Sequence, residues 1–172
     1  LQLVANIRIS NIKKVFFMKK YYIHIYNKLI ELARNKDLYK NFKNQDVFSD
    51  RLTFFLLHFA IFFKVFKNKE NKKSLQDIYD FTFRQLELSI REIGYGDQSI
   101  NKKMKEYLNL FHDIIDKFHF WDELNKEQKE KIIENYTSNS ENTSFLLDYF
   151  ENFLISLKKN TLNSYIKSVI KS

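Results

Sequence analysis

The segment SINKKMKEYLNLFHDIIDKF, residues 99–118, has the most regular apolar pattern in the chain. Its apolar side chains recur at three- and four-residue steps, which places them along one face of an α-helix. These apolar residues are Ile100, Met104, Tyr107, Leu108, Phe111, Ile115 and Phe118. The lysines and acidic residues of the segment fall outside this stripe. The pattern therefore predicts an amphipathic helix whose apolar face packs against the rest of the protein.

The same periodicity predicts helices over residues 21–34, 74–93 and 127–136, and a helical region from residue 144 that breaks near Asn160 and then resumes. The helix over residues 74–93 is expected to start at a cap on Ser74 and to bury Ile93 at the end of its apolar stripe. Asn125 with Gln128 predicts a capping box before residue 127, and Ser49 or Asp50 is expected to cap the helix that begins at residue 51. Residues 51–66 are apolar all round, but the run is shorter than the roughly 20 residues that cross a bilayer, and Lys64 and Lys67 close it. We expect a central helix with neighbours on all sides. Because no strand pattern competes, the predicted fold is all-α, a single helical bundle of five to six helices.

Composition supports this class and limits the chemistry. The 172 residues fit one domain, and the absence of proline with only two glycines leaves little to interrupt long helices. The absence of cysteine excludes disulfides, thiolate metal sites and cysteine nucleophiles. A net charge of +8 suggests a nucleic-acid or anionic membrane partner. Part of this charge reflects a general bias towards Lys, Asn, Ile, Phe and Tyr, which AT-rich coding sequences produce.

Residues 1–18 differ from the rest because they contain basic but no acidic residues and end at a start-like Met18-Lys19-Lys20. We interpret them as an N-terminal extension that precedes the true start, which leaves residues 19–172 as the all-helical domain. A mitochondrial transit peptide and a membrane-surface helix are the alternatives.

Signatures of enzymes are missing. Two glycines cannot build a phosphate-binding loop or a dinucleotide fingerprint, and no H-E-x-x-H motif occurs. His112 and His119 share a helix face but lack a carboxylate as third ligand, and His58 lies in the apolar helix, where a hydrogen-bonded core histidine is expected. We therefore predict no catalytic residue, metal, cofactor or small-molecule substrate, and a protein that is not an enzyme.

The most informative segment is IREIGYGDQS, residues 90–99, which holds both glycines of the chain. Gly94 is placed to end one helix, and Asp97 or Ser99 to cap the next, so the pattern predicts a tight corner between helices. That corner alone accounts for the glycines. A functional interpretation adds the charged residues that surround it: Arg91, Glu92, Asp97, Lys102, Lys103 and Lys105.

At this corner the chain resembles the ubiquinol–cytochrome c chaperone family. The similarity rests on LSIREIGYGD, residues 88–97, followed by Lys102, Lys103 and Met104, and on Leu57-His58 upstream. It covers residues 22–118. The resemblance implies a non-enzymatic assembly chaperone that binds newly made cytochrome b and supports assembly of the ubiquinol–cytochrome c reductase complex. The partner-binding residues that we assign on this basis are Arg91, Glu92, Gly94, Gly96, Asp97, Lys102, Lys103 and Lys105.

The resemblance also implies a location and further partners. We expect the protein in the cytoplasm, peripheral on the inner face of the bacterial inner membrane, with the mitochondrial matrix as the alternative. Besides the cytochrome b client, we expect the protein to contact an anionic membrane surface and to act near the ribosome. The competing hypothesis is a basic helical nucleic-acid-binding module, motivated by the net charge and by the lysines after Asp97.

Overall fold

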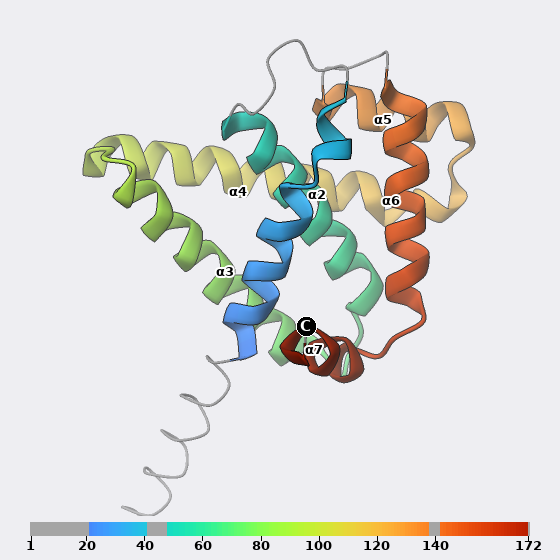
Figure 1. Cartoon of the computed structure of the whole chain (residues 1–172), viewed down its shortest axis with the longest axis horizontal. Coiled ribbons are helices and arrows are strands. Elements are labelled where there is room, and N and C mark those ends of the chain that lie inside the picture. Colours follow the sequence, from blue (N-terminus) through green and yellow to red (C-terminus); the bar gives the residue numbers. More distant parts are fainter. Residues whose placement is uncertain (1–20, 41–47, 138–141, 172) are drawn as a thin grey trace, which may run out of the picture.

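The computed structural model describes residues 21–40, 48–137 and 142–171, so the predictions for residues 1–18 lie outside the described residues. The described residues are helical and contain no strand (Figure 1). After a helix over residues 21–33 the elements are η1 (Lys36–Tyr39), α2 (Phe48–Phe66), α3 (Lys72–Glu92), α4 (Asp97–His119), η2 (Trp121–Glu123), α5 (Lys126–Thr137), α6 (Thr143–Lys158) and α7 (Leu162–Lys171). The all-α prediction is confirmed. The described ranges hold seven α-helices rather than five to six. The break predicted near Asn160 is present, and it separates α6 and α7 as two distinct helices.

Helix α2 lies at the centre of the bundle and packs mainly against α4 and α6 (Figure 1). Its side chains from Phe54 to Phe62 are all buried, which explains why its sequence is apolar all round. The expected central helix is therefore confirmed. Among the helices that the structure describes, none combines the length and the apolar character needed to span a bilayer.

The buried face of α4 differs slightly from the predicted apolar stripe. Ile100, Phe111 and Phe118 are buried as expected, but Ile114 is buried too, whereas Ile115 is only half-buried. The Phe111 ring packs against four aromatic rings of α2 and α3, with centroids 5.0–5.8 Å apart: Phe59, Phe63, Tyr79 and Phe83. Packing against two helices at once widens the buried face beyond a single stripe.

The helix starts agree with the sequence only in part. Helix α2 begins at Phe48, so Ser49 and Asp50 lie in its first turn and do not cap it. Helix α3 begins at Lys72 after Asn71, two residues before the expected cap at Ser74. The expected capping box before α5 is present: the Gln128 N–H donates to Asn125 Oδ1 at 2.9 Å, and the Asn125 N–H donates to Gln128 Oε1 at 3.0 Å.

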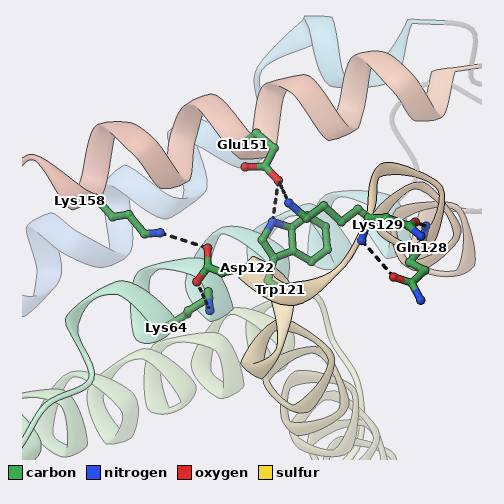
Figure 2. A network of polar contacts seen from close by, with 8 residues as sticks. Lys64, Trp121, Asp122, Gln128, Lys129, Glu151 and Lys158 are labelled. Carbon is green, nitrogen blue, oxygen red and sulfur yellow. Dashed lines mark hydrogen bonds and ion pairs between the residues drawn. The ribbon is translucent and has the colours of Figure 1, made fainter.

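A buried tryptophan joins the α4–α5 turn to α6 (Figure 2). The Trp121 ring stacks on Phe118 with centroids 4.2 Å apart, and its Nε1–H donates to Glu151 Oε1 at 2.9 Å. Lys129 of α5 pairs with the same carboxylate oxygen at 2.8 Å and lies over the indole ring. One carboxylate thus connects three elements and holds the end of α4 in place.

Candidate functional site

The corner between α3 and α4 projects from the bundle, at the left of Figure 1. Ile93 caps the C-terminus of α3, and Gly94 follows with φ 99°, a backbone conformation that L-residues rarely adopt. The Gly94 N–H donates to the Arg91 carbonyl at 3.0 Å. Glycine at this position is therefore a requirement of the fold, as the sequence predicts.

Gly96 is different. It is the N-cap of α4 with φ −69° and ψ 155°, an extended conformation open to any residue, and a Cβ placed there would meet no atom within 4 Å. Asp97 is the first residue of α4 rather than its cap, and Ser99 lies inside the helix. The expectation that the corner alone accounts for both glycines is thus wrong for Gly96.

Arg91 connects the two helices across the corner. Its Nε–H and Nη2–H groups donate to Glu87 Oε1 at 3.1 and 2.9 Å, and Nη1–H donates to Asp97 Oδ1. Hydrogen bonding from Arg91 holds the pKa of the Glu87 carboxyl below its ordinary value. Of the predicted partner-binding residues, Arg91 and Asp97 are therefore brought together, although they pair with each other.

The three predicted lysines of α4 point to different surroundings. Lys103 Nζ lies 4.7 Å from the centroid of the Tyr95 ring. Lys105 lines a groove of about 680 Å³ between α3 and α4, and Lys102 is exposed to solvent. The corner therefore presents Tyr95 and Lys103 as one unit, with Lys105 turned towards α3.

An apolar pocket adjoins the corner, and the sequence did not predict it. The pocket has a volume of about 380 Å³ and lies between the helix over residues 21–33, the start of α2 and the end of α3. Glu92 and Ile93 of the corner belong to its lining, together with Phe48 at the start of α2. Ile93 is 59% exposed and Phe48 is 41% exposed. The predicted burial of Ile93 is wrong, because α3 ends one residue before it.

The polar part of the pocket comes from charged residues at its rim. Arg34, Arg51 and Glu92 line it, and inside it the Tyr26 hydroxyl lies 3.2 Å from the Ser89 hydroxyl. An apolar interior with a few charged groups around it is typical of a binding surface for an amphipathic segment. We call the residues of this pocket and the corner that adjoins it the corner pocket.

His58 is buried in the core and its ring nitrogens are both hydrogen-bonded. Nδ1–H donates to the Phe54 carbonyl at 2.6 Å, so in the neutral ring Nε2 accepts from the Tyr149 hydroxyl at 2.9 Å. Burial lowers the pKa of His58 to about 4. The prediction of a hydrogen-bonded core histidine is confirmed. Over the described residues, no group of three or more metal-ligating side chains occurs.

Comparison with known proteins agrees with the resemblance seen in the sequence. Residues 40–118 match the family model described as ubiquinol-cytochrome C chaperone, a range that contains α2, α3, the corner and α4 up to Phe118. The crystal structure of the Cbp3 homolog from Brucella abortus is similar to this chain with a TM-score of 0.70, at 20% sequence identity over 96% of this chain and 93% of that chain. At this identity the likeness concerns the fold, including the helices after Trp121. No curated protein matches the chain. Residues 40–118 of this chain are therefore similar to the ubiquinol-cytochrome C chaperone family, in agreement with the resemblance found at the corner.

Proposed function

We propose that this protein is a non-enzymatic assembly chaperone that binds newly made cytochrome b and supports assembly of the ubiquinol–cytochrome c reductase complex. The similarity of residues 40–118 to a chaperone family supports a role in the assembly of this complex. The structural observation that carries the proposal is the corner pocket, where exposed apolar side chains gather beside charged groups.

The corner pocket suits a membrane-protein client. Before assembly such a client exposes apolar segments that need to be covered, and Phe48 and Ile93 offer apolar surface at the mouth of the pocket. The charged groups at the rim favour one orientation of a bound segment, because a wrong orientation would leave charges unpaired. Gly96 adds a place where a client can approach the backbone closely, since no side chain of this chain occupies that space.

The proposal also includes a cellular location. We propose that the protein binds its membrane-protein client at the inner face of the bacterial inner membrane, or in the mitochondrial matrix in the alternative setting. Proximity to the ribosome would let the chaperone meet its client before the apolar segments aggregate. Cell fractionation, followed by detection of the protein in the membrane and soluble fractions, tests the proposed location.

Affinity purification of the tagged protein from gently solubilised native membranes, followed by mass spectrometry, tests the client. Ile93→Ser removes apolar surface from the corner pocket, and Ile155→Ser is the matched control, because Ile155 is 49% exposed on α6, away from the corner. Burying one isoleucine contributes roughly 1.5–3 kcal/mol, so Ile93→Ser is expected to reduce capture about tenfold or more. Wild-type protein and the Ile155→Ser variant are expected to enrich cytochrome b equally.

Two results would contradict the proposal. Capture that is lost equally in both variants would remove the corner pocket from the account. Enrichment of RNA or DNA instead of cytochrome b, with an affinity that falls steeply with salt, would support the nucleic-acid-binding module.

A further inference from the structure

A second groove lies at the other end of α3 from the corner pocket. It has a volume of about 1080 Å³ and is formed by the end of α2, the start of α3 and the last turns of α4. Its apolar lining consists of Ala60, Phe63, Leu75, Tyr79, Phe111 and Ile115. We call it the basal groove, because the turn between α2 and α3, which contributes to its lining, lies towards the lower end of the bundle in the view of Figure 1.

Positive charge gathers at one end of the basal groove. Lys67, Lys69 and Lys72 line it at the turn between α2 and α3, whereas the apolar residues lie further along the helices. Among the described residues, no carboxylate forms an ion pair with any of these three lysines. Asp116 is the one acidic residue in the lining that the structure describes. The groove therefore combines a cationic end with an apolar interior.

Lys64 also lines the groove but has partners of its own (Figure 2). Its Nζ lies 3.0 Å from Asp122 Oδ2 and donates to the His119 carbonyl at 3.4 Å. Hydrogen bonding from Lys64, and then from Lys158, holds the pKa of the Asp122 carboxyl below its ordinary value. Lys64 thus fixes the wall of the groove, and the three other lysines are the groups open to a ligand.

We propose that the basal groove binds one anionic phospholipid, with its phosphate on Lys67, Lys69 and Lys72 and an acyl chain along the apolar lining. Charge complementarity supports an anionic ligand. The separation of charge from apolar surface supports an amphiphile with one charged end. An acidic amphipathic helix carries its charges along its whole length, which fits less well where the lysines gather at one end. The inference rests on the membrane-side location of the proposed function, and gives that location a chemical basis.

The test uses short-chain lipids below their micelle concentration, so that binding to a single molecule is measured. Dihexanoyl phosphatidylglycerol and dihexanoyl phosphatidylcholine are titrated into isotopically labelled protein and followed by NMR. We expect the anionic lipid to bind about 25- to 125-fold more tightly, which is the effect of two or three lysines at roughly fivefold each. Resonances of both the lysine end and Ile115 are expected to shift.

Two charge-matched variants locate the site. Lys67→Gln/Lys69→Gln/Lys72→Gln is expected to weaken binding of the anionic lipid about 100-fold, at roughly fivefold per lysine. Lys102→Gln/Lys103→Gln/Lys105→Gln removes the same charge from α4 near the corner, and is expected to change lipid affinity less than twofold. Circular dichroism checks that both variants keep their helices.

Several results would overturn the proposal. These are equal affinity for the two lipids, equal loss in the two variants, shifts that spare Ile115, or tighter binding of an acidic amphipathic peptide. Inorganic phosphate that binds as tightly as the lipid would show that the apolar lining contributes nothing. Cytochrome b capture by the Lys67→Gln/Lys69→Gln/Lys72→Gln variant is measured separately, so that failure of the lipid site and failure of the client role can be told apart.

Discussion

The two glycines of the corner allow a sharp test, because the structure gives them unlike roles. Gly94 has φ 99°, whereas Gly96 has φ −69° and open space around it. Holding an alanine in a strained conformation of this kind costs about 1–3 kcal/mol, and the gain from a stiffer unfolded chain recovers less than about 1 kcal/mol. Gly94→Ala is therefore expected to lower the free energy of unfolding by about 1–2 kcal/mol.

Gly96→Ser is the matched variant. Serine is a favoured N-cap and Gly96 occupies the N-cap position of α4, so the free energy of unfolding is expected to stay within about 0.5 kcal/mol or to rise. Both variants are measured by urea denaturation followed by circular dichroism, since the helices provide the signal. A Gly94→Ala variant that unfolds no more easily than Gly96→Ser would refute the assignment of backbone strain to Gly94.

The same pair separates folding from client binding. If Gly96 provides close approach for a client, Gly96→Ser loses capture of cytochrome b while its stability is retained. Gly94→Ala at low temperature, where it is still folded, is expected to keep capture. Equal capture by Gly96→Ser and wild type would show that a client does not approach the backbone at Gly96.

Three further outcomes follow from individual residues. The pKa of His58 is about 4 in the folded protein and has its ordinary value of 6.5 in the unfolded chain, so between these pH values His58 takes up a proton on unfolding. Its contribution to the free energy of unfolding is therefore full above pH 6.5 and falls towards pH 4. Between pH 7.5 and 5.0 this costs about 2 kcal/mol by urea denaturation, and His58→Leu lacks that part of the pH dependence. Asn125→Ala removes the cap of α5 and is expected to lower the free energy of unfolding by about 1 kcal/mol in the same assay. An unchanged free energy of unfolding would show that Asn125 does not cap α5. Reversing the charge of Lys102 and Lys103 together is expected to weaken client capture, and unchanged capture would remove these lysines from the site.

The helices were predictable because their apolar residues repeat with the helical period and nothing interrupts them. The central position of α2 followed from its apolar residues on all sides, and the α5 capping box from Asn125 and Gln128. Helix starts were less predictable, because several polar residues near Phe48 and Lys72 are suitable for a first turn. The choice among them depends on which side chains tertiary packing buries.

The corner was visible in the sequence, but the surfaces beside it were not. Gly94 could be assigned because a positive φ is a local property of the backbone. Ile93 looked like one more member of a buried stripe, and its 59% exposure depends on where α3 stops. The corner pocket and the basal groove each combine residues of three helices far apart in the chain, which no local pattern encodes.

Site-specific photo-crosslinking in living cells tests the central claim most directly. A photoreactive amino acid replaces Ile93 in one variant and Ile155 in another, and crosslinked products are identified by mass spectrometry. The account predicts that the residue at position 93 forms an adduct with newly made cytochrome b and that the residue at position 155 does not. Adducts with cytochrome b from both positions alike, or from neither, would contradict it.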